Sequence, residues 1–306
     1  MKEWIEAMRL RTLPVSVAGV IGGTACAVFH HAFSLLPFLI CLLFAVLAQI
    51  ASNFANEYYD FKNGLDKKGR EGFRRGVTEG DIPPQQMKKA TFITLALAAA
   101  VGATLIIWGG WWLVFVGLAV AVFALAYSTG PFPLSHIGLG EVAVVIFFGF
   151  VPVVFTDYVQ TRVLYFDAPV VLVSSAVGLM AANVLIVNKY RDVDDDRNVG
   201  KKTSVVLLGK KFMSGVYFAD GILAAIFLAM ASSPLPFWVS AGWLAYLAFH
   251  TMLWDKMRFL SGAALNDILK WTSLILLAVT CYLLIIFACL KPEPLLLLPS
   301  SLSISL

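Results

Sequence analysis

The amino-acid sequence predicts an all-α, polytopic membrane helix bundle with about nine transmembrane helices. The chain of 306 residues is 59% hydrophobic and only 14% charged, whereas soluble domains carry roughly 45–50% apolar and about 25% charged residues. Its mean hydropathy is +0.82. The apolar residues also gather in runs close to the roughly 20 residues that a membrane helix needs. Most of the chain is therefore expected to lie in lipid.

Nine such runs follow one another along the chain. They are expected at residues 13–30, 35–56, 89–109, 111–128, 139–158, 168–188, 213–231, 235–253 and 268–290. The third and fourth runs are separated only by a turn at Gly109 and Gly110, next to Trp111 and Trp112, residues typical of the membrane interface. We expect residues 1–290 to form a single transmembrane domain and residues 291–306 to form a short tail.

A first acidic stretch follows the second apolar run. Asn56 and Asp60 lie one helical turn apart and share a face of the predicted helix. Gly64 is expected to end that helix, so that Asp66 folds back toward the same point. Glu57 points away from this face and is expected to flank the site. The spacing thus predicts that polar oxygen atoms of Asn56, Asp60 and Asp66 converge.

A second acidic stretch follows the sixth run. Asn188, Asp192 and Asp196 are spaced i, i+4 and i+8, so they would share one face of a helix. Both stretches open with Asn, and they lie four predicted helices apart. This arrangement resembles an internal duplication with a site where the repeats meet.

The side chains of these stretches favour a hard divalent cation. Carboxylates held close together repel each other and become partly protonated unless a cation lies between them. Oxygen ligands without His or Cys nearby suit Mg²⁺, which commonly takes phosphate oxygens as further ligands. The alternative for either stretch alone is a solvated charged loop after a membrane helix.

Basic residues follow both acidic stretches. Arg70 and Arg75 come after the first, with Gly76 beside them, and Lys201 follows Gly200 after the second. Arginine binds phosphate oxygens in bidentate fashion, and glycine lets backbone N–H groups approach an anion. Together with the acids, these residues describe a diphosphate-binding site at a membrane surface. The alternative is that these basic residues only set the orientation of the chain in the membrane.

The distribution of basic residues predicts the orientation. All but two of the 23 Lys and Arg lie at the N-terminus or in the connections after the second, sixth and eighth runs; the exceptions are Arg162 and Lys291. The positive-inside rule then places the N-terminus and both acidic stretches in the cytoplasm and the chain in the cell (inner) membrane. Because the charge of +4 is divided among loops, it does not indicate nucleic acid.

Several aromatic side chains are candidates to shield a carbocation, which ionisation of an allylic diphosphate would leave. They are Tyr58, Tyr59, Tyr127, Tyr190, Phe147 and Phe148. Plain packing is the alternative for each of them. His136, in the connection before the fifth run, is expected to be an ordinary loop residue rather than a base.

The acidic stretches resemble those of the UbiA-type intramembrane prenyltransferase superfamily. The resemblance rests on N-x-x-x-D-x₅-D (Asn56, Asp60, Asp66), N-x-x-x-D-x-x-x-D (Asn188, Asp192, Asp196), L-R-T-L-P at residues 10–14 and G-L-G-E at residues 138–141. Within the superfamily, the chain is most similar to the branch that prenylates 1,4-dihydroxy-2-naphthoate in menaquinone biosynthesis. The matching stretches cover residues 9 to about 210.

This resemblance implies a helix bundle around a central cavity that opens sideways to membrane lipid. It also implies Mg²⁺-dependent transfer of a polyprenyl group from a polyprenyl diphosphate to an aromatic acceptor. With the naphthoate, CO₂ and diphosphate would be released and the product would be demethylmenaquinone. By position, the metal ligands would be Asn56, Asp60, Asp66, Asn188, Asp192 and Asp196, the four aspartates being catalytic. Asn56, Asn188, Arg70, Arg75 and Lys201 would contact the diphosphate.

Two departures from the naphthoate branch leave the acceptor open. Glu57 stands where the branch usually has Asp, and Lys189 stands where it often has Asn. The same fold and reaction with 4-hydroxybenzoate, homogentisate or a tetrapyrrole is therefore an alternative. A cation or solute transporter is a further alternative, although transport sites usually lie near the bilayer midplane.

Overall fold

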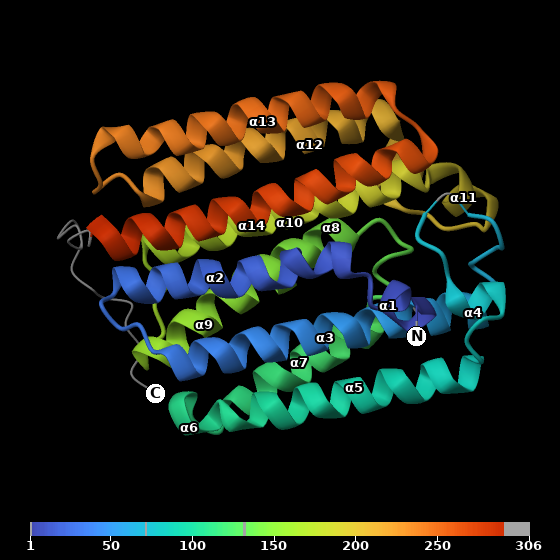
Figure 1. The fold of residues 1–306 in the computed structure, drawn as a ribbon, viewed down its shortest axis with the longest axis horizontal. Helices are drawn as coiled ribbons and strands as arrows, with labels where there is room; N and C mark the ends of the chain where they lie inside the picture. Colours follow the sequence, from blue (N-terminus) through green and yellow to red (C-terminus); the bar gives the residue numbers. More distant parts are fainter. Residues whose placement is uncertain (1, 71, 131–132, 291–306) are drawn as a thin grey trace.

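The computed structural model describes residues 2–70, 72–130 and 133–290, and the predicted tail at 291–306 lies outside these residues. Every regular element in this part of the chain is helical (Figure 1). The elements are α1 (Lys2–Met8), η1 (Leu10–Thr12), α2 (Leu13–Phe29), α3 (Leu35–Lys62), α4 (Gly76–Glu79), α5 (Pro84–Thr104), α6 (Ile106–Gly109), α7 (Leu113–Ala126), α8 (Gly140–Val144), η2 (Val145–Phe150), α9 (Val151–Thr161), α10 (Ala168–Arg191), α11 (Val193–Asn198), α12 (Ser204–Ala231), η3 (Phe237–Val239), α13 (Ser240–Phe259), η4 (Gly262–Ala264) and α14 (Leu265–Leu290).

The helices confirm a multi-pass membrane protein. Among the described residues, seven helical segments are long and apolar enough to cross a membrane. In lipid, such helices satisfy their own backbone hydrogen bonds. The remaining two predicted spans correspond to α7, which is apolar but has 14 residues, and to α13, whose last turns carry Asp255, Lys256 and Arg258. The count of nine crossings therefore stays a prediction.

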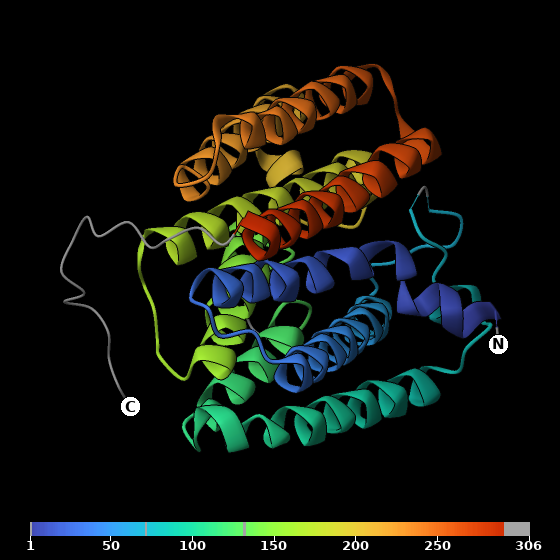
Figure 2. The same ribbon diagram turned by 60° about the vertical axis from the view of Figure 1, so that its left-hand side comes forward.

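Helix α10 lies in the middle of the bundle. It packs against α2, α12, α14 and η2, and most of its side chains are buried. In Figures 1 and 2, α12 and α13 cover one side of α10 and α14, while α2, α3 and α5 follow on the other side. The largest hydrophobic core accordingly surrounds α10. Helices α3, α5 and α7 lie away from this core and form one wall of a cavity described below.

The segment η2 is a π-helical turn that places aromatic residues against that cavity. Pro152 follows it and has no N–H to donate to the carbonyl group of Phe148, which favours the wider turn. The turn packs closely on α10 through Gly149. A Cβ atom added at Gly149 would lie 2.5 Å from the carbonyl oxygen of Ser174 and 2.6 Å from Cα of Gly178.

At the end of the bundle opposite the acidic stretches, His30 joins three helices. Its ring nitrogens lie 3.0 Å from Asp157 of α9 and 3.0 Å from Asp167, the N-cap residue of α10. Burial alone would lower the pKa of His30, but the hydrogen bonds to the two carboxylates outweigh it and raise the pKa to about 9. A charged imidazole thus fixes the end of α2 to α9 and α10.

The close contact at Gly149 gives a test of the packing. We expect Gly149→Ala to lower stability by about 1–3 kcal/mol, because the added methyl group overpacks the contact with α10. Gly215→Ala on α12 is the control, since nothing lies within 4 Å of a Cβ atom there. Thermal unfolding of the purified protein in nanodiscs measures both. Equal midpoints for the two variants would contradict this packing.

Candidate active site

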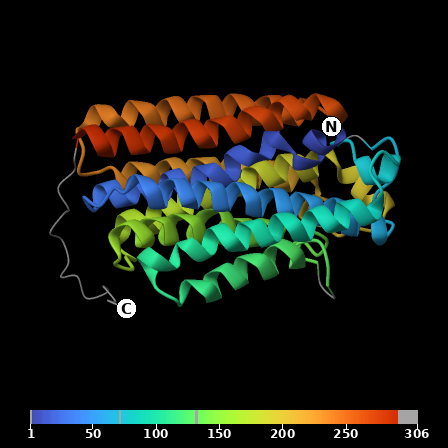
Figure 3. The ribbon, with the colours of Figure 1, turned by 60° about the horizontal axis from the view of Figure 1, so that its bottom comes forward.

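The two acidic stretches meet at one end of the bundle. Helix α3 ends at Lys62, and Gly64 has a φ of +67° that L side chains rarely adopt. The N–H of Leu65 then donates to the carbonyl of Asp60 (2.8 Å), so the chain folds back as predicted. Figures 1 and 3 show the connection from α3 to α5, drawn in cyan, at the same end as α1, and Figure 1 places α11 there too.

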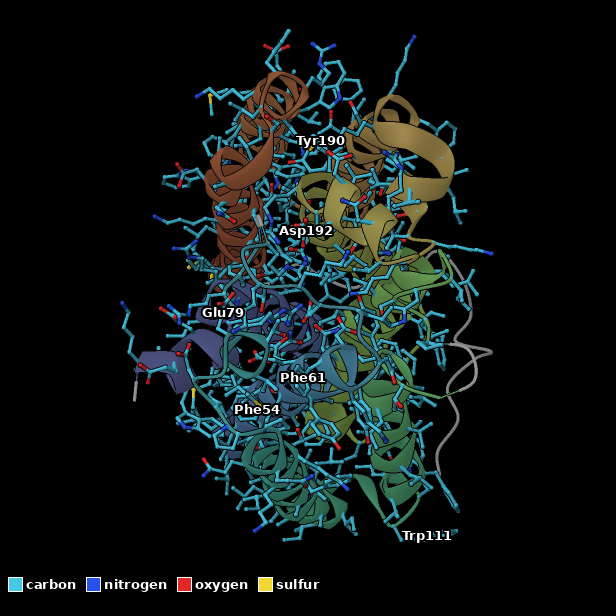
Figure 4. The ribbon with its side chains drawn as sticks, turned by 90° about the vertical axis from the view of Figure 1, so that its right-hand side faces the viewer. Phe54, Phe61, Glu79, Trp111, Tyr190 and Asp192 are labelled. Carbon is cyan, nitrogen blue, oxygen red and sulfur yellow. The ribbon has the colours of Figure 1, made fainter. Side chains whose placement is uncertain are left out.

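The second stretch is not one continuous helix, in contrast to the prediction. Helix α10 ends at Arg191, α11 begins at Val193, and Asp192 lies between them with φ −89° and ψ 8°. The N–H of Asp196 still donates to the carbonyl of Asp192 (2.8 Å). The expected one-turn separation is therefore kept. In Figure 4, which looks onto this end of the bundle, Asp192 lies near the middle of the end face.

Two basic side chains join the four aspartates across the stretches. Arg70 donates to Asp66 and, through Nη2, to Oδ2 of Asp192 at 2.7 Å. The Nζ atom of Lys201 lies 2.8 Å from Asp60 and 4.0 Å from Asp196. The six side chains are each 1–9% exposed. We call these residues the acid–base cluster: Asp60, Asp66, Arg70, Asp192, Asp196 and Lys201.

The other predicted site residues border this cluster. Arg75 Nε lies 3.3 Å from Oδ2 of Asp66. Asn56 donates to Asp60 (3.3 Å) and to Ser128 (3.0 Å), and its own oxygen accepts a hydrogen bond from Arg9 (2.6 Å).

On the second stretch, Asn188 accepts a hydrogen bond from Arg191, which also binds Asp192 at 2.6 Å. All nine residues predicted from the sequence thus lie within or directly beside one buried cluster.

The charges in the cluster are unevenly compensated. Burial raises the pKa of Asp192, but Arg191 and Arg70 outweigh it, so this pKa lies below its usual value. For Asp66, burial dominates over Arg70, and the pKa is raised. Burial likewise raises the pKa of Asp196 to about 6, with repulsion from Asp192 adding to it and Lys201 opposing it. Asp192 is therefore the better compensated carboxylate, and Asp66 and Asp196 are less well compensated.

The donor set fits a hard divalent cation. The side chains that converge offer carboxylate and amide oxygens, which Mg²⁺ prefers. The buried Oδ2 atom of Asp66 accepts no hydrogen bond. Within residues 2–70, 72–130 and 133–290, no three Asp, Glu, His or Cys side chains stand close enough to hold a metal ion as they are. This follows from Arg70 and Lys201, which lie between the carboxylates.

Three contacts near the cluster were not predicted from the sequence. The Nε2 atom of His136 lies 3.1 Å from Oδ1 of Asp60. Glu57 is fully buried and accepts the N–H of Val77 (3.0 Å), so it anchors α4. Lys189 pairs with Glu141 at 3.2 Å. The G-L-G-E motif could have indicated the pair of Lys189 and Glu141, because Gly140 of this motif leaves room for the Lys189 ammonium group.

An apolar cavity of about 390 Å³ lies between α3, α5, α7, η2 and α9. A smaller chamber of about 100 Å³ connects this region with the acidic stretches, because both Asn56 and Asn188 line it. The chamber and the cavity share four lining residues, namely Gln49, Ser52, Phe123 and Phe148. The chamber, with Asn56 and Asn188 in its lining, thus adjoins the apolar cavity.

The aromatic candidates divide into two groups. Tyr127 and Phe148 line the chamber, and Phe147 lines the cavity, where it stacks on Phe123 with 3.8 Å between ring centroids. The other three candidates line neither space: Tyr58 and Tyr59 belong to a separate small core, and Tyr190 belongs to the main core. Their role is packing, which was the alternative for each.

Fold and geometry define a multi-pass helix-bundle membrane protein with a buried charged cluster beside an apolar cavity. The chain belongs to the UbiA prenyltransferase family, whose profile matches residues 16–274. The prediction of an enzyme of this family is confirmed.

Several relatives carry the name of one enzyme. The chain is 37% identical over 284 residues to the 1,4-dihydroxy-2-naphthoate octaprenyltransferase of Escherichia coli (strain K12), covering 88% of this chain and 89% of that protein. It is 33% identical over 247 residues to the protein of the same name from Mycobacterium tuberculosis (strain ATCC 25618 / H37Rv), covering 79% and 82%.

Solved structures share the fold. A UbiA homolog from Archaeoglobus fulgidus bound to DMAPP and Mg²⁺ has a TM-score of 0.64 at 15% identity, covering 92% of this chain and 99% of that one. The same homolog bound to GPP and Mg²⁺ has a TM-score of 0.65 at 14% identity, covering 92% and 99%.

The raised pKa of Asp196 gives a pH-dependent prediction. Because its folded pKa of about 6 exceeds the ordinary 3.8, ionisation is less favourable in the folded chain, and stability falls as pH rises through this interval. We expect Asp196→Asn, without divalent metal, to unfold at a higher temperature than the wild type at pH 8. This advantage should shrink toward pH 4.

The control is Asp194→Asn on the same helix, where the side chain is 79% exposed. Thermal unfolding across pH 4–8 measures all three proteins. A constant difference between Asp196→Asn and the wild type over this range would refute the prediction.

Proposed function

We propose that this chain transfers a polyprenyl group from an allylic polyprenyl diphosphate to 1,4-dihydroxy-2-naphthoate with the help of Mg²⁺. CO₂ and diphosphate leave, and the product is the quinol form of demethylmenaquinone, because the step includes no oxidation. The observation that carries the proposal is the small chamber itself, which adjoins the apolar cavity and is lined by Asn56 and Asn188 at the border of the acid–base cluster. The names of the bacterial relatives support the naphthoate as acceptor.

In this proposal, the acidic stretches hold the metal and the basic residues hold the diphosphate. The metal ligands are Asn56, Asp60, Asp66, Asn188, Asp192 and Asp196; Arg70, Arg75 and Lys201, together with the two asparagines, contact the diphosphate. Bound Mg²⁺ would supply positive charge that stabilises the departing diphosphate. The A. fulgidus homolog, solved with Mg²⁺ and DMAPP, supports this choice of metal.

The cavity would take the isoprenoid chain and bring its first carbon to the chamber. There the bond from carbon to the diphosphate oxygen breaks, and a bond from that carbon to the aromatic ring forms. Loss of the ring carboxylate as CO₂ returns its electron pair to the ring. Phe148 and Tyr127 line the chamber where the carbocation would form, and their ring faces would stabilise it.

The two departures from the naphthoate branch do not lie in the chamber. Glu57 anchors α4 through Val77, and Lys189 pairs with Glu141. Neither residue lines the chamber or the cavity. They therefore give no reason to prefer 4-hydroxybenzoate, homogentisate or a tetrapyrrole.

We further propose that residues 1–290 form a single domain of the cell (inner) membrane with the cluster on the cytoplasmic side. The positive-inside rule supports this orientation, because the loops that carry the cluster also carry most of the basic residues. On this side, both a soluble aromatic acid and released diphosphate have access to water.

Asp60→Asn and Asp192→Asn test the assignment of the carboxylates. We expect each to lower kcat/KM for prenyl transfer by at least about 100-fold, because the metal that would hold the diphosphate loses a charged ligand. Asp255→Asn, at an exposed site on α13, is the matched control. Transfer is measured with purified protein whose thermal unfolding is recorded in parallel. Wild-type turnover in either cluster variant would refute the assignment.

Mass spectrometry of the lipid product tests the acceptor. Purified protein is incubated with Mg²⁺, a polyprenyl diphosphate and one of three acids: the dihydroxynaphthoate, 4-hydroxybenzoate or homogentisate. We expect product only from the first, with a mass that shows loss of CO₂. A prenylated product from another acid, and none from the naphthoate, would assign a different acceptor.

A further inference from the structure

Arg70 and Lys201 occupy the positions between the carboxylates that the proposed function gives to metal ions. Arg70 joins Asp66 to Asp192, and Lys201 joins Asp60 to Asp196. Each basic residue therefore bridges two acids, and Arg70 links the two acidic stretches directly. A divalent cation cannot bind between these carboxylates until the basic side chains move.

The charge balance makes that movement depend on a second ligand. Four buried carboxylates are faced by Arg70, Lys201, Arg75 and Arg191. A divalent ion that entered alone would bring two more positive charges beside buried cations that have no other anion to bind. A diphosphate supplies such an anion, because its oxygens accept charge-assisted hydrogen bonds from Arg and Lys.

The local backbone suits such a movement. Arg70 directly follows Gly69 (φ +74°), and Lys201 directly follows Gly200 (φ +77°). At both glycines nothing lies within 4 Å of a Cβ position, although their backbone N–H groups donate to Glu79 and to the carbonyl of Arg197. The Nε atom of Arg70 is buried without a hydrogen-bond partner. By contrast, Asp60 lies within α3 and Asp196 within α11.

We infer that Arg70 and Lys201 are exchangeable counter-ions that make divalent-metal binding dependent on diphosphate. They neutralise the carboxylates first, then transfer to the diphosphate oxygens and release the carboxylates for the metal. Metal and diphosphate consequently bind with positive cooperativity, and the metal binds weakly by itself. This inference rests on the proposed function of the same site.

The inference predicts effects of opposite sign in one variant. Lys201→Met removes a positive charge from between Asp60 and Asp196, so binding of metal alone becomes tighter. The same variant loses a partner of the diphosphate, so diphosphate binding becomes weaker. A lysine that only bound diphosphate would leave metal binding unchanged, and a lysine that only stabilised the fold would change neither affinity.

The experiment measures protein-bound Mn²⁺ by equilibrium dialysis of the full chain in nanodiscs, with and without inorganic pyrophosphate. Free Mn²⁺ is corrected for the complex that pyrophosphate forms in solution. For the wild type, we expect pyrophosphate to tighten Mn²⁺ binding by about tenfold or more, which is a usual size for coupled sites. For Lys201→Met, we expect Mn²⁺ alone to bind at least about fivefold tighter and the effect of pyrophosphate to fall below about threefold.

Lys202→Met is the matched control, because this neighbour is exposed and its backbone N–H donates to the carbonyl of His136. Lys201→Arg should restore the cooperativity. Lys201→Gln replaces the Met variant if that variant does not fold. Unchanged or weaker binding of Mn²⁺ alone in a folded Lys201 variant would overturn the inference, as would equal wild-type affinities with and without pyrophosphate.

Asp60→Asn separates this inference from the proposed function. If the carboxylates bind metal, Asp60→Asn lowers Mn²⁺ binding whether or not Lys201 acts as a counter-ion. If Mn²⁺ does not bind the wild type under either condition, the metal site itself is absent and the proposed function fails with the inference.

Discussion

Burial of carboxylates at the end of a membrane helix bundle requires compensating positive charge, and this constraint shapes the site. An isolated ionised carboxylate in such an environment is very unfavourable, so it must be paired or bind a cation. Here each aspartate of the cluster faces an Arg or Lys, and the pairs Arg70–Asp192 and Lys201–Asp60 join the two acidic stretches. The ion pairs therefore determine where the connections after α3 and α10 lie, and thereby the closure of that end of the bundle.

The sequence contained most of the information needed to predict the fold and the position of the site. Apolar runs give membrane helices because lipid offers the backbone no other hydrogen-bond partners. Asn56, Asp60 and Asp66 were expected to converge because Gly64 adopts a positive φ. The number of membrane crossings could not be predicted in the same way. Helix α7 is short, and α13 ends in charged residues, so their composition does not show whether these segments lie in lipid or in water.

Individual contacts were harder to predict, for reasons that differ from residue to residue. Arg70 and Lys201 are long side chains beside flexible glycines, so their spacing in the sequence does not fix which carboxylate each contacts. His136 lies in a connection without periodicity, and only the fold brings it to Asp60. The helix break at Asp192 was not predicted from the sequence. The spacing of the side chains is the same with or without the break, because the i, i+4 backbone hydrogen bond from Asp196 to Asp192 is kept.

The position of the cluster at the helix ends, and not at the midplane, follows from the chemistry of an amphiphilic substrate. A diphosphate carries charge that lipid cannot solvate, whereas an isoprenoid chain gains by leaving water. Loops at the bundle end can supply Arg, Lys and carboxylates, and the helix interior supplies the apolar cavity. Phe123 and Phe148 line both spaces, so they mark the point where the two environments meet. The bond that joins the diphosphate to the isoprenoid chain would be held at this point. The diphosphate would then lie among charged side chains and the isoprenoid chain in the apolar cavity, each in the surroundings that stabilise it.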